Sequence, residues 1–155
     1  MSVAFRRESD EEHKEPKFEL PLPSGPNLVT PSGLAAIEAK VAVLEAVETE
    51  AMPEADRAEH LRTLRYWRTR LATAQPAPPP PEGEVAFGSR VVFVLGGETR
   101  TIDIVGDDEA EPAKGRIAFS APLARALMGG YAGERIDFGG KPEAIEVTST
   151  APIPD

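Results

Sequence analysis

The chain has 155 residues, enough for one ordinary domain or two small modules, and its 17 basic and 26 acidic side chains leave a net charge of −9. This acidity argues against binding to nucleic acid through clustered Lys and Arg. The absence of cysteine excludes disulfides, thiolate zinc sites and a cysteine nucleophile, and two histidines are too few for a multi-histidine metal site. The sequence contains neither an apolar run long enough to span a membrane nor the apolar core of a signal peptide, so we expect a cytoplasmic protein with no membrane partner.

The prolines, 16 in all, divide the chain into segments of different character. Residues 1–28 combine four prolines with dense, mixed charge and too few apolar side chains to offset the entropy lost on ordering, which predicts a disordered tail. The alternative is a docking peptide, anchored through Phe5 with Arg6 and Arg7, or through residues 18–20 (Phe-Glu-Leu).

Residues 29–75 are predicted to form a helical hairpin, that is, a short antiparallel coiled coil. Thr30 followed by Pro31 is a typical helix start, and Pro53 can begin a second helix. Each helix carries an apolar stripe at spacings of three and four residues, made of Leu34, Ile37, Val41 and Leu44 in the first and of Leu61, Leu64, Trp67 or Arg68, and Leu71 in the second. We expect two helices of about 20 residues, each ~30 Å long.

The two predicted helices carry opposite charge, because glutamates dominate the first and arginines dominate the second. Such faces help to orient an antiparallel pair, although each exposed ion pair contributes well under ~1 kcal/mol. The arginines form either a solvated, paired face or a surface that meets a partner, and they are Arg57, Arg62, Arg65, Arg68 and Arg70.

Residues 76–83 are predicted to be a stiff linker, because five of the six residues from 76 to 81 are prolines. Residues 84–150 then alternate short strand patterns with glycine turns, and Ser120 is expected to cap one helix that begins at Pro122. Strands are expected at residues 85–87, 91–95, 100–105, 116–119, 134–138 and 143–147, and residues 151–155 form a tail. The chain is therefore predicted to be α+β, a helical hairpin followed by a small antiparallel sheet domain with one helix.

No nucleophile, base and orienting group occur together, which indicates a binding protein rather than an enzyme, with no cofactor of its own. Residues 107–109 (Asp-Asp-Glu) could hold a divalent cation, but they lack the periodicity of a calcium loop, and a solvated turn is the simpler interpretation. Acidic groups near the hairpin turn could present oxygen ligands to a cation held by another molecule, or could simply keep a helix junction polar. These groups are Glu48, Glu50, Glu54 and Asp56.

Two motifs in the sheet segment resemble the bacterial transcription elongation factors GreA and GreB. Residues 104–110 (Ile-Val-Gly-Asp-Asp-Glu-Ala) are similar to the family's strand ending in Val-Gly-Asp-Asp/Glu-Glu-Ala. Residues 117–129 (Ile-Ala-Phe-Ser-Ala-Pro-Leu-Ala-Arg-Ala-Leu-Met-Gly) are similar to its Ile-Ser-x-x-Ser-Pro-Leu/Ile-Ala-Arg-Ala-Leu-Leu/Ile-Gly. Residues 85–88 and 73–75 also look like the family, so the resemblance covers the sheet segment well and the hairpin loosely.

This resemblance implies an FKBP-like fold for the C-terminal part, which would bind RNA polymerase at the rim of its secondary channel. The hairpin would enter that channel and act beside the polymerase's own catalytic Mg²⁺, so the chain would meet nucleic acid only through the transcription complex. The predicted polymerase-binding surface lies around Ser120, Pro122, Leu123 and Arg125. A monomer is expected if the hairpin is self-contained.

The hairpin tip departs from the family pattern, whose tip motif Gly-Asp-Leu-x-Glu-Asn-Ala-x-Tyr is absent. Matching the motif to residues 58–60 places Asp56 where the Glu belongs, Pro53 where the Asp belongs and Arg57 where the Asn belongs. Half of the carboxylate pair is therefore missing, and the arm is also shorter than a full family arm. Because a cleavage group must reach hydrogen-bond distance of its target, we expect weak or absent stimulation of transcript cleavage.

The leading hypothesis is thus a Gre-like regulator that binds RNA polymerase at the secondary channel. A second hypothesis is a true transcript-cleavage factor that uses the rearranged tip carboxylates. A third is a prolyl isomerase, which the FKBP-like fold would suggest but which needs an aromatic-lined apolar pocket. A fourth is an interaction module unrelated to transcription.

Overall fold

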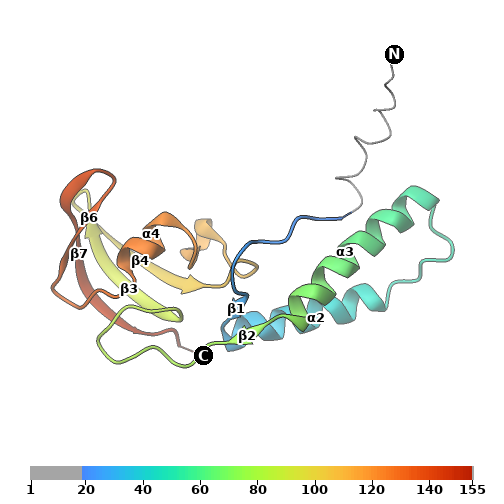
Figure 1. Cartoon of the computed structure of the whole chain (residues 1–155), viewed down its shortest axis with the longest axis horizontal. Coiled ribbons are helices and arrows are strands. Elements are labelled where there is room, and N and C mark those ends of the chain that lie inside the picture. The colour runs from blue at the N-terminus through green and yellow to red at the C-terminus, as the bar shows by residue number, and fades with distance from the viewer. Residues whose placement is uncertain (1–18, 155) are drawn as a thin grey trace, which may run out of the picture. The chain divides into compact units, whose positions relative to one another are not determined.

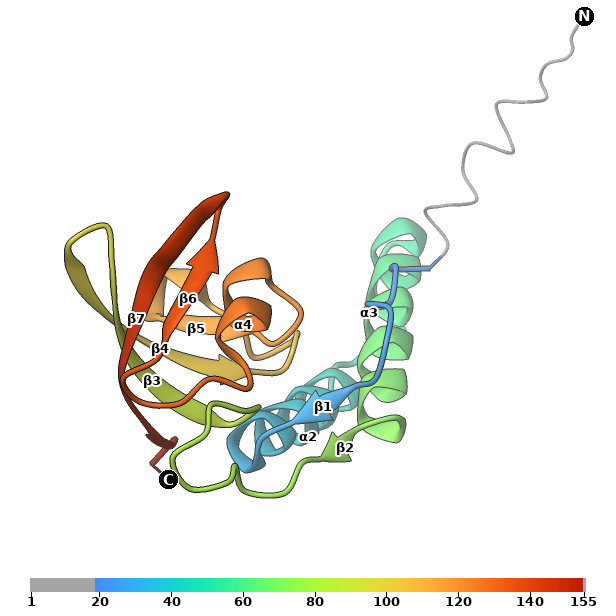
Figure 2. The same cartoon turned by 60° about the vertical axis from the view of Figure 1, so that its left-hand side comes forward.

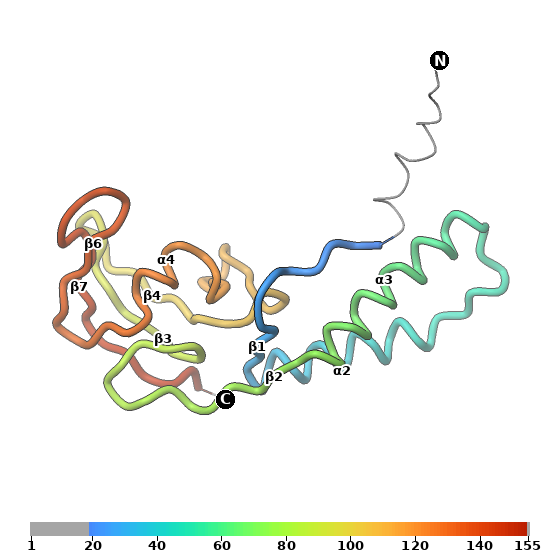
Figure 3. The backbone as a smooth tube through the Cα atoms, viewed as in Figure 1, coloured from blue at the N-terminus to red at the C-terminus, as the bar shows by residue number. Residues whose placement is uncertain are grey.

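Helix α2 (Pro31–Glu45) begins at the predicted position in the computed structural model, which describes residues 19–154. The Thr30 hydroxyl accepts a 2.9 Å hydrogen bond from the backbone N–H of Gly33, as expected of an N-cap residue. Helix α3 (Glu54–Ala72) follows after a turn, and Figure 3 shows the two helices as the arms of a hairpin. The predicted helical hairpin is therefore present.

The apolar stripes of the hairpin are buried largely as predicted. Ile37, Val41 and Leu64 are all buried, with exposed fractions of 3%, 7% and 6%. Leu61 was assigned to the stripe wrongly, because it is 39% exposed. Its neighbour His60 is the residue whose ring contacts the last turn of α2, and successive side chains of a helix point in directions about 100° apart, so Leu61 lies on another face of α3.

The arms of the hairpin are shorter than the expected 20 residues. Helix α2 has 15 residues and α3 has 19, which correspond to about 22 and 28 Å. Helix α2 ends at Glu45, and the β-branched residues Val47 and Thr49 that follow are weak helix formers. The prediction of two equal arms was therefore wrong for the first one.

Side chains of opposite charge meet across the hairpin, in agreement with the charge pattern. Arg68 on α3 lies 2.9 Å from the carboxylate of Glu45 on α2. The ammonium of Lys40 lies 5.8 Å from the ring centre of Trp67, within the range of a cation–π contact. The ion pair and the cation–π contact both favour the antiparallel arrangement of the two helices.

The chain forms two compact units, one with residues 37–73 and the stretch that ends at Gly25, the other with residues 26–36 and 74–155. In the second unit, which we call the sheet unit, β1 (Leu28–Val29) pairs in parallel with β2 (Gln75–Pro76). Figure 2 shows these two strands side by side. The divisions fall after Gly25, Ala36 and Thr73, so one lies within α2 and none lies in the proline run.

Within the described part of the chain, the larger sheet has five strands in the order β5-β4-β3-β7-β6. Figure 1 labels β3, β4, β6 and β7, and Figure 2 also labels β5. Their bounds are β3 (Ser89–Leu95), β4 (Glu98–Val105), β5 (Arg116–Ala118), β6 (Arg135–Phe138) and β7 (Lys141–Pro152). The predicted hairpin turns at residues 96–97 and 139–140 are both confirmed, and so is the α+β class.

We expected a purely antiparallel sheet, but the sheet is mixed, because β5 pairs with β4 in parallel. The segment between them contains the 3-10 helix η2 (Pro112–Lys114) and runs back along β4, so that Arg116 lies opposite Asp103. Gly115 ends η2 with a φ of 79°, a conformation that glycine adopts without strain. The backbone N–H of Asp103 donates a 2.8 Å hydrogen bond to the Gly115 carbonyl.

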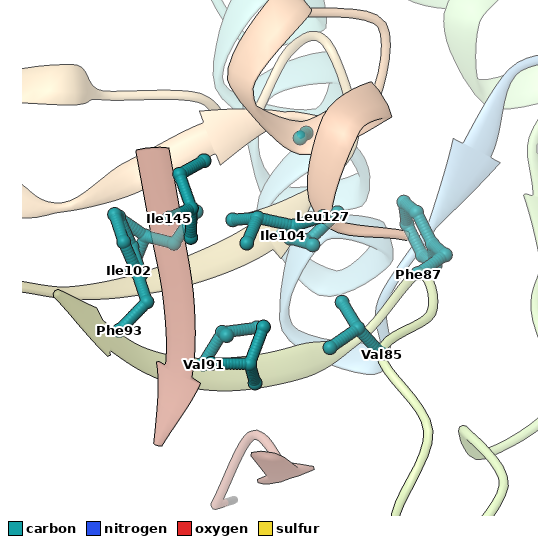
Figure 4. Close-up of a cluster of buried hydrophobic side chains, with 10 residues drawn as sticks. Val85, Phe87, Val91, Phe93, Ile102, Ile104, Leu127 and Ile145 are labelled. Carbon is teal, nitrogen blue, oxygen red and sulfur yellow. The ribbon is translucent and has the colours of Figure 1, made fainter. Parts of the chain in front are cut away.

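The core of the sheet unit lies between the sheet and helix α4 (Pro122–Leu127). Figure 4 shows side chains from β3, β4, β7 and α4 gathered in one cluster. Phe93, Ile104, Leu127 and Ile145 are completely buried there. The rings of Phe87 and Phe119 meet edge to face at 5.5 Å, an arrangement that adds to the burial energy.

Two local predictions in this unit were wrong. The strand expected at 85–87 is irregular, because Val85 exchanges backbone hydrogen bonds with Gly129 and Gly130 instead of joining the sheet. Ser120 does not cap α4, whose N-cap position is Ala121 with no side-chain hydrogen bond. The Ser120 hydroxyl instead donates a 2.8 Å hydrogen bond to Asp107.

The predicted terminal and linker segments are only partly described. Residues 1–18, including the candidate anchors Phe5, Arg6 and Arg7, lie outside the described residues. Glu19 forms an ion pair of 2.7 Å with Arg65 on α3, and this hydrogen-bonded carboxylate raises the pKa of the guanidinium. Strands also extend into the three segments that were predicted to be tails or a linker. Strand β1 starts at Leu28 in the first, β2 ends at Pro76 in the second, and β7 continues to Pro152 in the third.

Replacement of Val41 by Ala should destabilise the hairpin, because it removes two buried methyl groups and leaves a cavity, at a cost of about 2 kcal/mol. The matched control is Val43→Ala on the same helix, where the side chain is 63% exposed and only the small gain in helix propensity remains. Thermal unfolding followed by circular dichroism at the helical band measures both. Equal midpoints for the two variants would contradict the packing described here.

Candidate functional site

The four predicted acidic residues of the hairpin tip lie near the turn but on two different elements. Glu48 and Glu50 belong to the loop between the helices, whereas Glu54 and Asp56 belong to the first turn of α3. All four are exposed. Acidic side chains in the first turn stabilise a helix through its dipole, so the second pair already has a structural role.

Two side chains of α3 bond to the backbone around the hairpin turn, one to the loop and one to the end of α2, and neither contact was predicted from the sequence. The guanidinium of Arg57 donates hydrogen bonds to the backbone carbonyls of Thr49, at 3.2 Å, and Glu50, at 3.3 Å. The ring Nε2 of His60 lies 3.0 Å from the carbonyl oxygen of Leu44 in the last turn of α2. A cation in the first turn of a helix opposes the helix dipole, and this anomaly at Arg57 is the signal that could have identified it.

The arrangement of acids at the tip does not form a metal site by itself. Among residues 19–154, no three His, Cys, Asp or Glu side chains come close enough to hold an ion. The guanidinium of Arg57 adds positive charge at the loop, which disfavours a cation there. The chemistry available at the tip is therefore that of separate, solvated carboxylates.

The acidic patch at residues 107–109 is part of the structure of the sheet unit. Asp107 accepts the hydrogen bond of Ser120, and Glu109 accepts a 2.6 Å hydrogen bond from the hydroxyl of Thr30. These bonds occupy carboxylate oxygens that a cation would need, which agrees with the interpretation of the patch as a turn.

The predicted docking surface is formed by the start of α4. Ser120, Pro122 and Arg125 are exposed, and the last two lie three residues apart, so they share one face of the helix. Leu123 is half-buried and packs against the core, so it supports this surface from below.

A groove of about 740 Å³ lies elsewhere in the sheet unit, between the proline run and the end of the chain. Of the described residues that line it, Phe87 is the one aromatic, and four are charged: Arg90, Asp103, Glu109 and Arg116. Arg90 donates two hydrogen bonds, of 2.8 and 3.0 Å, to Asp103, and this pairing raises the pKa of the guanidinium. Such a lining differs from the aromatic-lined apolar pocket that we expected of a prolyl isomerase.

No helix in the described range 19–154 has the length and apolarity to cross a membrane.

Comparison with known proteins matches the segment that carries the motifs. The family description "Transcription elongation factor, GreA/GreB, C-term" matches residues 80–150. The transcription elongation factor GreA of Ralstonia nicotianae is 41% identical over 71 residues, which are 43% of this chain and 45% of that protein. The chain thus spans less than half of this curated relative.

A second relative matches over a longer stretch. The transcription elongation factor GreA of a Psychrobacter species is 33% identical over 132 residues, which cover 68% of this chain and 84% of that protein. The solved GreA/GreB structure from Nitrosomonas europaea covers 83% of this chain and 99% of its own, at 19% identity and a TM-score of 0.40. Since the sequence match extends over most of the Psychrobacter protein and the sheet unit carries the family's motifs, the chain belongs to the GreA/GreB family of transcription elongation factors.

Proposed function

We propose that this protein binds RNA polymerase and regulates elongation at the secondary channel, with weak or absent stimulation of transcript cleavage. It acts as a cytoplasmic monomer and is not itself an enzyme, because the catalytic Mg²⁺ belongs to the polymerase. Membership of the GreA/GreB family supports the partner and the process. The sheet unit anchors the protein, and the hairpin provides the regulatory part.

The main support for weak or absent stimulation of cleavage is the position of Arg57 at the hairpin tip. Its guanidinium is bonded to the loop backbone, where the family resemblance would place an asparagine. A tip that assists a metal reaction should lower the cost of bringing in a divalent cation, and a fixed positive charge raises that cost. Pro53, at the position of the family's aspartate, supplies no carboxylate in exchange.

The length of the arm supports the same conclusion. Helix α2 has 15 residues, and each residue fewer shortens an arm by about 1.5 Å. Groups that take part in catalysis must lie within hydrogen-bond distance of the reacting atoms, so a loss of one or two turns removes them from reach. A shorter arm still occupies part of a channel and competes there with other factors.

The alternative is a true cleavage factor in which the exposed acids of the tip replace the missing pair. The available carboxylates are Glu48 and Glu50 on the loop and Glu54 and Asp56 on α3. Their separation over two elements and the absence of a metal-binding cluster among the described residues make this the less favoured candidate.

Cleavage of RNA in backtracked transcription complexes distinguishes the two candidates. We expect the unmodified protein to raise the cleavage rate by less than about tenfold over polymerase alone. This corresponds to lowering the activation free energy by less than about 1.4 kcal/mol. The triple variant Glu50→Ala, Glu54→Ala, Asp56→Ala should then change this rate by less than about twofold. Strong cleavage by the unmodified protein that disappears in the triple variant would establish the alternative.

Binding to purified RNA polymerase tests the anchor surface. Arg125→Ala should weaken binding by about tenfold, because it removes an exposed arginine from the centre of the proposed contact. The matched control is Arg135→Ala on β6, which removes an exposed arginine outside that surface and should leave the Kd within about twofold. No binding by the unmodified protein would remove the proposed function, and equal effects of the two substitutions would remove the assigned surface.

A further inference from the structure

The first turn of α2 is held by a residue far away in the sequence. The hydroxyl of Thr30 accepts a hydrogen bond from the backbone N–H of Gly33. It also donates a 2.6 Å hydrogen bond to the carboxylate of Glu109, 79 residues later. Thr30 is only 8% exposed. We call Thr30, Gly33 and Glu109 the latch, and all three residues belong to the sheet unit.

Glu109 supplies a charge that α2 lacks. The first turn of α2 contains no acidic residue, although this is where a negative charge stabilises a helix. In α3, by contrast, Glu54 and Asp56 fill the corresponding positions within the helix itself. The carboxylate of Glu109, bonded to the N-cap hydroxyl, therefore takes the place of a local acid at the start of α2.

Two glycines make room for the latch. A Cβ on Gly33 would lie 2.6 Å from a carboxylate oxygen of Glu109, closer than atoms can pack. A Cβ on Gly106 would overlap the backbone carbonyl of Leu28, immediately before the latch. Gly106 therefore admits only glycine while the loop at 106–109 lies against β1, whereas a side chain at position 33 would have to displace the carboxylate end of Glu109 and so break the latch.

We propose that Glu109 is a positioning residue, which acts on the hairpin through Thr30 and the first turn of α2. This inference rests on the proposed function, because it concerns how an arm that begins in the sheet unit delivers its effect on the polymerase. Helix α2 leaves the latch and continues without interruption into the hairpin. Loss of the latch frees the start of the arm but leaves the anchor surface on α4 in place.

Hydrogen exchange of the Gly33 amide tests the latch on the free protein. Glu109→Ala should accelerate this exchange by about tenfold, because the N-cap hydroxyl loses the charged group that orients it. Thr30→Val should accelerate it at least as much, and Thr30→Ser should restore slow exchange, because serine keeps the hydroxyl. The matched control is Glu111→Ala in the segment between β4 and β5, which removes exposed ion pairs with Lys114 and Arg116 and should leave the Gly33 amide unchanged.

A second readout separates positioning from simple stability. In Glu109→Ala we expect the Kd for RNA polymerase to stay within about twofold, while the effect of the bound protein on elongation rate falls by about fivefold or more. Unchanged exchange at Gly33 in Glu109→Ala would overturn the latch itself. Faster exchange with an unchanged effect on elongation would overturn the positioning role.

These outcomes are distinct from a failure of the proposed function. If the unmodified protein does not bind polymerase, the proposed function is wrong and the positioning role falls with it, while the exchange experiment still decides whether the latch exists. Equal losses of binding and of effect in Glu109→Ala would also overturn positioning, because they would place Glu109 in the anchor.

Discussion

A parallel pair of two-residue strands brings together the chain before α2 and the chain after α3, and both ends of the helical segment return to the sheet unit through it. Strand β1 (Leu28–Val29) leads into α2, and β2 (Gln75–Pro76) follows α3. The Gln75 N–H donates a 2.8 Å hydrogen bond to the Asn27 carbonyl, and the Ala77 N–H donates one of 3.3 Å to the Val29 carbonyl. Bonds from alternate residues leave Pro76 at a position where its missing N–H costs nothing, so a proline fits this edge strand.

The proline run gains a structural role from this pairing. Because β2 fixes its beginning, Ala77 packs against the core of the sheet unit and residues 78–80 line the groove. Proline restricts the unfolded chain, so less conformational entropy is lost when residues 76–81 are ordered along the sheet unit. A composition that predicts a stiff linker is thus equally suited to a segment that lies along a folded unit.

The sequence was sufficient for features that are set by neighbouring residues. The stripe of Ile37 and Val41, the cap at Thr30 and the turns at residues 96–97 and 139–140 all follow from local spacing and chemistry. The bond from Thr30 to Glu109 joins residues 79 apart, and no local pattern indicates it. For the same reason the parallel pairing of β5 could not be foreseen, because it depends on the path of the whole segment 106–115.

The candidate site shows the same division. The acids of the tip could be found from the local sequence, since a short polar stretch at a turn is a local feature, whereas the surface on α4 was predicted only from the family resemblance. The role of Arg57 was missed because its partners are backbone carbonyls on the far side of the loop, which any sequence would provide. Its charge alone placed it among the other arginines of α3.

Those arginines bear on how an acidic protein can act near nucleic acid. Within the hairpin unit, Arg68 pairs with Glu45, Arg65 pairs with Glu19, and Arg57 holds the loop backbone. Basic groups that are already bonded within the chain release few counterions from a phosphate backbone, so they contribute little to nucleic-acid affinity. The net charge of −9 and the internal use of these arginines therefore both argue against binding to nucleic acid through clustered basic side chains.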